Sequence, residues 1–227
     1  MDSKVPCIAC GEPILPATAE RTGGKCMPCF NDHDGIRPAQ LRIQAAQLLG
    51  ERTPTDTLLH MIEQALTDTV LRVASSAAGT LDKERIYGCW LFHTHFQFVD
   101  GLTIFTEATS RAGFRWSLYD TPHHLYLRDE FDHTDHLLLA LEQRGGGEAI
   151  ASAVECVCLR VLRRLRDASV FGPHVLLTLA EGDQGYAQRY AYAGLFSGLE
   201  ALEGFRADVE PLNWQHVEHW RSRIPSF

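Results

Sequence analysis

The sequence predicts an α+β protein in which an antiparallel sheet is packed by helices, behind a small N-terminal module rich in cysteine. Two runs of β-forming residues flank the pair Asp100-Gly101, which is the strongest short-range signal for a hairpin. Apolar residues recur at helical spacing before and after this hairpin. Two Cys-x-x-Cys motifs precede all of these elements. We therefore expect one mixed core with a small appended module.

Length and composition indicate a globular protein. The chain has 227 residues, of which 45% are hydrophobic, enough for one core of ordinary size and a small extra module. No run reaches the roughly 20 apolar residues of a membrane span, and the first residues lack the features of a signal peptide. We expect a cytoplasmic protein without a membrane partner. The 29 acidic and 21 basic residues give a net charge of −8, which disfavours nucleic acid as a partner.

The two Cys-x-x-Cys motifs predict a metal site. Cys7 and Cys10 form the first pair, Cys26 and Cys29 form the second, and fifteen residues separate the pairs. This spacing is typical of a structural zinc site, in which four thiolates close a tetrahedral shell around Zn²⁺ and leave no position for a substrate. The alternatives are two disulfides or a redox-active pair. Persistent disulfides are rare in cytosolic proteins, and a thioredoxin-like site needs only one Cys-x-x-Cys motif. Both alternatives therefore fit the two motifs less well than a zinc site does.

The cysteine-rich segment has too few apolar residues to fold by burial alone. Metal binding contributes about 10–16 kcal/mol in zinc-finger peptides and would supply the missing folding energy. The charges of the segment nearly cancel, which favours a structural or protein-binding role over phosphate binding. We assign residues 1–36 to a zinc ribbon, 37–52 to a connecting helix and 53–227 to the α+β domain. The apolar side chains of the ribbon are Ile8, Ile14, Leu15, Met27 and Phe30.

Two helices are expected before the hairpin. The first fits residues 38–49, with proline near its start and Gly50 at its end. The second opens at Thr53-Pro54, with Thr53 as its cap. An apolar stripe at intervals of three and four runs along this second helix, and we expect it to cover the aromatic face of the hairpin. The stripe consists of Leu59, Ile62, Leu66, Val70 and Val73.

The hairpin itself is expected to turn at Asp100-Gly101. A two-residue loop there would pair Val99 with Leu102. Because side chains alternate along a strand, aromatic side chains lie on one face of the hairpin, which helices must cover. The other face carries His93, His95 and Gln97 and is expected to be more exposed to solvent. The expected aromatic face carries Trp90, Phe92, Phe96, Phe98 and Phe105.

The second half of the chain is expected to mix strands and helices. Residues 114–119 are expected to form another strand, and a helix over 137–144 should end at the three glycines that follow. A second apolar stripe at helical spacing runs from Ile150 to Leu165. Four arginines beside it indicate a solvated helix end or a site for an acidic partner. Residues 175–180 are typical of a strand covered on both faces, and 186–202 of a helix.

Several short segments of the sequence resemble a known family. The twenty residues from Cys10 to Cys29 resemble a zinc-ribbon tag on small uncharacterised bacterial proteins of the polymorphic-toxin immunity type. Glu84-Arg85-Ile86-Tyr87-Gly88, Arg115-Trp116-Ser117 and Gly182-Asp183-Gln184 are similar to a bacterial domain family of unknown function that is often grouped with them. No catalytic motif comes with this resemblance. It implies a protein that binds another protein and is not an enzyme.

The alternative is a metal-dependent hydrolase. His93 and His95 would lie on one strand face, where they could begin a catalytic centre of three ligands and a water molecule. The sequence has no His-Glu-x-x-His motif, P-loop, nucleophile elbow or dinucleotide fingerprint, and exposed polar histidines explain the pattern equally well. We therefore predict a non-catalytic protein-binding protein with a structural zinc ribbon, of the toxin-neutralising immunity type. Further ligands of the alternative site would come from Asp132, His133, Asp135 and His136.

Overall fold

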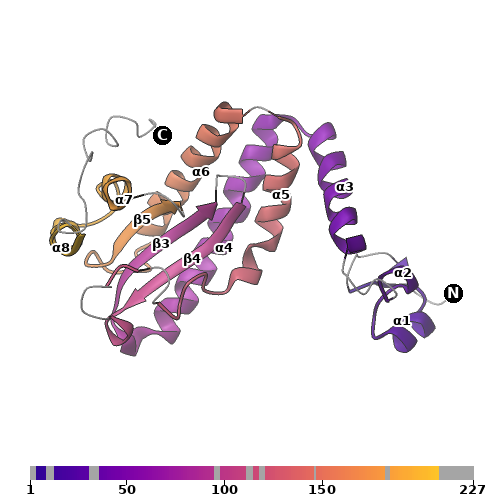
Figure 1. Cartoon of the computed structure of the whole chain (residues 1–227), viewed down its shortest axis with the longest axis horizontal. Coiled ribbons are helices and arrows are strands. Elements are labelled where there is room, and N and C mark those ends of the chain that lie inside the picture. Colours follow the sequence, from indigo (N-terminus) through magenta and orange to yellow (C-terminus); the bar gives the residue numbers. More distant parts are fainter. Residues whose placement is uncertain are drawn as a thin grey trace.

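The computed structural model describes residues 4–8, 13–30, 36–94, 98–110, 115–117, 121–145, 147–181 and 185–209. The expected fold class is confirmed, because helices pack against a central sheet that contains an antiparallel hairpin (Figure 1). The ribbon lies beyond the N-terminal end of a long helix, α3 (Ile36–Arg52). None of the helices within the described ranges combines the length and the apolar character that crossing a bilayer requires.

The central sheet has three strands in the order β4-β3-β5. β3 (Ile86–Thr94) pairs antiparallel with β4 (Phe98–Thr106) and parallel with β5 (Leu176–Glu181). A parallel neighbour needs a long crossover connection, and the chain between β4 and β5 supplies one that contains two helices. The prediction that 175–180 forms a strand covered on both faces is confirmed, since Leu176 to Ala180 are all buried.

The hairpin does not turn at Asp100-Gly101, so that prediction is wrong. Phe92 pairs with Gly101, whereas the next residue, His93, pairs with Val99. Asp100 is therefore the extra residue of a β-bulge inside β4, and the chain reverses between the ends of β3 and β4. Gly101 has a φ of +137°, and a bulge exploits the same freedom of glycine as a tight turn. The Asp-Gly pair marks an irregular point within the strand.

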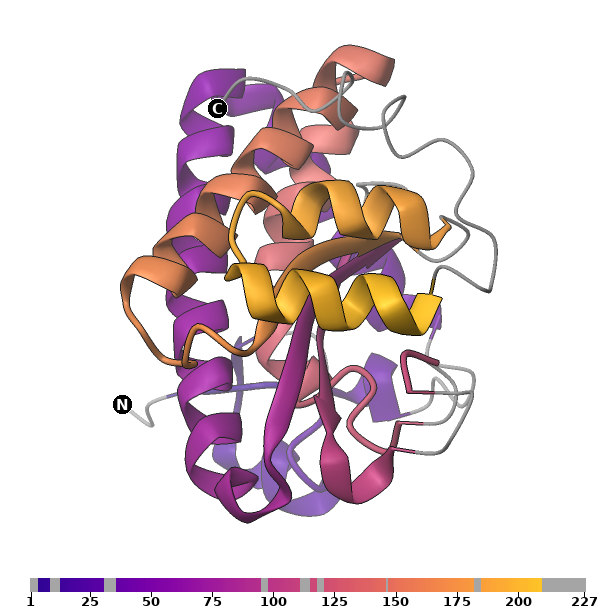
Figure 2. The same cartoon turned by 90° about the vertical axis from the view of Figure 1, so that its left-hand side faces the viewer.

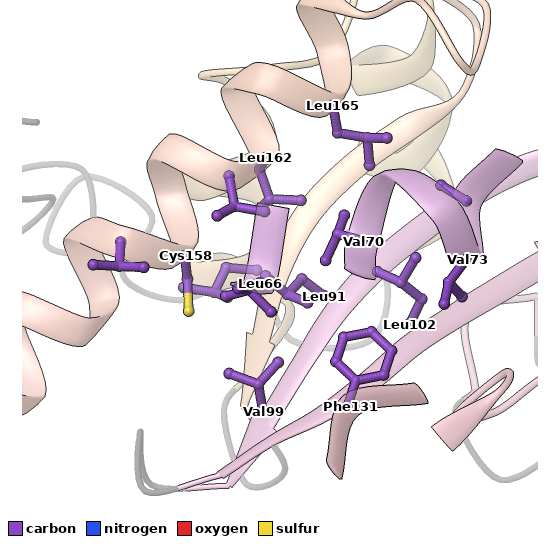
Figure 3. Packing of buried hydrophobic residues seen from close by; sticks show 14 of the residues in the cluster. Leu66, Val70, Val73, Leu91, Val99, Leu102, Phe131, Cys158, Leu162 and Leu165 are labelled. Carbon is purple, nitrogen blue, oxygen red and sulfur yellow. The ribbon is translucent and has the colours of Figure 1, made fainter. Parts of the chain in front are cut away.

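One face of the sheet packs on a layer of three helices, α4 (Thr55–Thr80), α5 (Asp132–Glu142) and α6 (Gly147–Asp167). Figure 3 shows side chains of α4 and α6 meeting Leu91 and Leu102 of the strands. The two predicted stripes are confirmed, apart from the half-buried ends at Leu59 and Ile150. Their buried members are Ile62, Leu66, Val70 and Val73 in α4, and Val154, Val157, Val161 and Leu165 in α6.

Some helix boundaries differ from the expected ones. α3 continues through Gly50 to Arg52, and α5 begins five residues before 137. The predicted cap at Thr53 is wrong, because α4 begins at Thr55 and no side-chain hydrogen bond caps it.

The other face of the sheet carries aromatic side chains, as expected, but α4 does not cover it. α7 (Tyr186–Ala193) and α8 (Leu199–Val209) lie over this face instead (Figure 2). The helix predicted over 186–202 is thus two helices. Trp90 and Phe105 are almost fully buried here, with 4.5 Å between their ring centroids. Phe92 belongs to the same cluster, whereas Phe96 and the side chain of Phe98 lie outside the described residues.

Trp116 completes this aromatic cluster. Its ring stacks on Trp90 with 5.8 Å between centroids and 3° between planes, and Phe205 of α8 meets it edge-on at 4.7 Å. Residues 115–117 form a turn, so the strand predicted over 114–119 is wrong at these positions. Sequence alternation identified the aromatic face, but its cover comes from segments that are distant in the chain.

The arginines of α6 are only partly solvated. Arg160 donates from Nε and Nη2 to one carboxylate oxygen of Glu63 in α4, at 2.9 and 2.7 Å, and Arg164 donates to the other. Burial raises the pKa of Glu63, but the hydrogen bond and charges of these arginines outweigh it and hold the pKa below its usual value. Arg166 donates to three backbone carbonyls at 2.6–2.9 Å, those of Phe196, Gly172 and Val175. Arg160, Arg164 and Arg166 are thus bound to other parts of the protein, although the Arg164 side chain is still 50% exposed.

Both edges of the sheet are covered at described positions. Along β4, Tyr126 N donates to Leu102 O at 2.7 Å, and Ile104 N donates to His123 O at 3.1 Å. Along β5, the Ser197 hydroxyl accepts from Leu177 N at 2.9 Å and donates to Leu177 O at 3.2 Å. These strand edges cannot receive an additional strand at those groups. The remaining short elements are η1 (Asp82–Glu84), η2 (Glu107–Thr109) and η3 (Arg128–Phe131).

The connecting helix α3 is packed against the domain. Ala46 is fully buried in the main core, and Gly50 lies so close to α5 that a Cβ there would be 2.4 Å from Ala140 O. Arg144 donates to the backbone carbonyls of Gly50 and Thr53, the second at 2.6 Å. The C-terminal half of α3 is therefore part of the same packed body as α5.

Candidate metal centre

The ribbon is built from a two-stranded sheet and two short helices. β1 (Val5–Pro6) pairs antiparallel with β2 (Pro13–Ile14), and α1 (Pro16–Thr22) and α2 (Met27–Phe30) follow. α1 ends at Gly23, whose φ of +62° is the left-handed conformation that glycine favours. Ile8 N then donates to Gly24 O at 3.0 Å, which brings the two cysteine motifs together.

Three of the four predicted ligands meet in this fold. The Sγ atoms of Cys7, Cys26 and Cys29 all lie within 4.8 Å of one another, and all three residues are buried. Zinc–thiolate bonds of about 2.3 Å in a tetrahedral site place sulfurs roughly 3.8 Å apart, so one ion fits among sulfurs this close. Cys10 lies outside the described residues. The three thiols could hold a metal ion.

Backbone N–H groups point at the sulfurs. Cys26 N donates to Cys7 Sγ at 3.1 Å, and Cys29 N donates to Cys26 Sγ at 3.4 Å. The thiolate is the form of cysteine that binds metal, and its sulfur can accept hydrogen bonds from backbone N–H groups. No disulfide joins any of the cysteines that the structure describes. The backbone around the cluster thus suits a negatively charged, metal-binding sulfur group.

The core of the ribbon is very small. Among the ribbon residues that the structure describes, Ile14 is the one buried apolar residue besides the three cysteines, with Val5 and Ala19 packed against the cluster. So little buried apolar surface cannot offset the conformational entropy of some thirty residues. The geometry therefore supports the expectation that metal binding provides much of the folding free energy of this module.

Most of the apolar side chains counted for the ribbon are exposed, which the sequence did not indicate. Ile8 is 72% exposed and Leu15 53%, and Met27 and Phe30 are exposed as well. Ile14 alone of the five is buried. The reason is geometric, because the three thiols occupy the centre of the module and leave little interior for larger side chains.

Among the described residues named for the hydrolase alternative, no group of three potential ligands comes together. His93 is fully buried, so its expected place on a wetter face is wrong; that face packs on α4, α5 and α6. His95 and Gln97 lie outside the described residues. His133 is exposed on α5. Within the described ranges, the cluster of Cys7, Cys26 and Cys29 is the only group of three or more potential ligands that come this close.

Comparison with known proteins identifies no family for this chain. No protein-family model matches the chain, no curated protein is significantly similar to it in sequence, and no solved structure significantly resembles it.

Proposed function

We propose that this chain is a non-catalytic protein-binding protein of the toxin-neutralising immunity type, whose ribbon is folded by one structural zinc ion. Cys10 would join Cys7, Cys26 and Cys29 to complete a shell of four thiolates. Thiolate sulfur selects soft or borderline metals, and a tetrahedral four-thiolate site is typical of structural zinc. Such a closed shell holds the backbone in place and offers no open position for a reaction.

The observation that carries the binding role is the exposure of large apolar side chains on the ribbon and α3. Six such residues are exposed there, against two in the rest of the described chain, so the exposed apolar surface is concentrated in one region. Exposed apolar groups that gather in one region favour contact with another protein. The six are Ile8, Leu15, Met27, Phe30, Ile43 and Leu48.

The immunity-type part of the proposal rests on the resemblance of the Cys10–Cys29 segment to ribbon tags of that class. The near-neutral charge of the ribbon supports a protein partner rather than nucleic acid.

Affinity isolation from the native host tests this function. The zinc-loaded full-length protein is compared with the double variant Ile8→Ser and Phe30→Ser, and mass spectrometry identifies what co-purifies. Leu127→Ser is the matched control, because Leu127 is 45% exposed and lies outside the ribbon and α3. We expect a protein that the wild type and the control retain and the double variant loses, with equal zinc content in all three. Recovery of no specific protein, or equal recovery by all three, would contradict the proposal.

A further inference from the structure

A cleft of about 640 Å³ lies between the start of β3, the turn at 115–117 and α8. This volume is in the range of pockets that hold ligands. Ile86, Tyr87 and Trp116 line it on one side. From α8, the lining includes three small residues, Ala201, Gly204 and Ala207, together with Glu200, Phe205 and Asp208. The base of the cleft is therefore aromatic, and its α8 side combines small residues with two carboxylates.

A hydrogen-bonded network holds the base of the cleft in place. Arg115 donates to Glu107 at 2.7 Å, and its guanidinium lies 4.2 Å above the ring of Tyr87. Trp116 Nε1 donates to Asp208 at 2.9 Å. Burial raises the pKa of Tyr87 to about 12, so its hydroxyl remains protonated and donates to Arg115 O. These contacts hold Tyr87, Arg115 and Trp116 in place before anything binds, so the base of the cleft is pre-organised.

Three other charged or titratable residues line the same cleft without such partners. Arg85, His174 and Glu200 are all exposed. Within the part of the chain that the structure describes, none of them forms a side-chain hydrogen bond or an ion pair. The cleft therefore offers two groups that can pair with an acid and one that can pair with a base. A ligand with both charges would match them.

We propose that this cleft binds a segment of the partner protein in which an apolar side chain stands between an acidic and a basic residue. The acidic residue pairs with Arg85 and His174, the basic residue pairs with Glu200, and the apolar side chain contacts the aromatic base of the cleft. This inference rests on the proposed protein-binding function and names a recognition element of the partner. Strand addition is not the mode, because the edges of β4 and β5 already have hydrogen-bond partners at Leu102, Ile104 and Leu177.

Selection from a random twelve-residue peptide library displayed on phage, with the zinc-loaded full-length protein as target, tests the inference. Gly204→Trp blocks the cleft, and Gly204→Ala is its matched control, since a Cβ at position 204 meets no atom within 4 Å. We expect enriched peptides with the acidic–apolar–basic pattern. A synthetic peptide of that sequence should bind Gly204→Trp at least tenfold more weakly than Gly204→Ala. Circular dichroism confirms folding, and Ala207→Trp replaces Gly204→Trp if the latter does not fold.

Charge reversal supplies a second readout. Arg85→Glu should weaken binding of the selected peptide, and changing the acidic residue of the peptide to lysine should restore it. Enrichment of no peptide, or equal binding to the blocked and control variants, would overturn the inference. If the affinity isolation still recovers a partner in that case, only the cleft is wrong. If it recovers none, the protein-binding function itself is wrong.

Discussion

Trp116 and Asp208 are 92 residues apart in the chain, and a hydrogen bond of 2.9 Å joins Trp116 Nε1 to Asp208 Oδ2. Arg115 Nε lies 3.5 Å from the same carboxylate oxygen. This single carboxylate therefore connects the last turn of α8 to the turn at 115–117, and so holds α8 over the aromatic face of the sheet.

Replacing that carboxylate should destabilise the protein. Asp208→Ala leaves the buried Trp116 Nε1 without its acceptor, and we expect the free energy of unfolding to fall by about 1–2 kcal/mol. Asp208→Asn keeps an acceptor oxygen and should lose less than half as much. Urea unfolding followed by tryptophan fluorescence measures both variants. Equal stability of Asp208→Ala and the wild type would show that α8 is held by apolar contacts alone.

Two glycines in helices should respond oppositely to alanine. Gly79 lies in α4, where an added Cβ meets no atom within 4 Å, so Gly79→Ala should stabilise the protein by roughly 0.5–1 kcal/mol. Gly50 lies in α3, where the Cβ would be 2.4 Å from Ala140 O, so Gly50→Ala should destabilise it by about 1–3 kcal/mol. Thermal unfolding of the two variants tests this contrast. A stabilising Gly50→Ala would mean that α3 does not pack closely on α5.

The domain boundary predicted at residue 53 remains a prediction, and truncation tests it. A fragment of residues 36–227 keeps α3, whose Ala46 is buried in the main core, and should unfold cooperatively without the ribbon. A fragment of residues 54–227 loses this helix and leaves Arg144 without the backbone carbonyls of Gly50 and Thr53. We expect a lower melting temperature for the shorter fragment. Equal melting temperatures would place α3 outside the cooperative unit.

The stability contributed by Glu63 should depend on pH. The pKa of Glu63 in the folded protein is lowered below the ordinary value of 4.5. Ionised Glu63 therefore stabilises the folded state fully above about pH 4.5, and this stabilisation is lost as the pH falls through the lowered pKa. At pH 7, Glu63→Gln should reduce the free energy of unfolding by about 1 kcal/mol. The difference from the wild type should shrink below pH 4.5. Urea titrations between pH 7 and 3 measure it, and a difference that does not change with pH would rule out the charge of Glu63 as its source.

The sequence predicted those parts of the fold that depend on local periodicity. The stripe from Ile62 to Val73 in α4 and the aromatic alternation in β3 follow from which residues face a core, and both are observed. The hairpin turn was misplaced because glycine with positive φ suits a turn and a bulge equally well, as Gly101 shows. No local pattern distinguishes the two.

The sequence could not predict which distant segments of the chain pack together. The burial of His93 depends on three helices that cover its side of the sheet, and the fixed position of Trp116 depends on α8. The cleft beside Tyr87 arises from the same long-range packing. The cysteine cluster is different, because motif spacing alone identified Cys7, Cys26 and Cys29 as neighbours.

The zinc content of the purified full-length protein tests the central claim most directly. Protein prepared without chelator or oxidant should contain one zinc per chain by elemental analysis. Cys26→Ser should lower this content strongly, and Cys10→Ser should do the same if Cys10 is the fourth ligand. His93→Ala, which lies outside the ribbon, should leave it at one. A zinc content near zero in the wild type would contradict the account, and so would a stoichiometry of two that His93→Ala reduces to one.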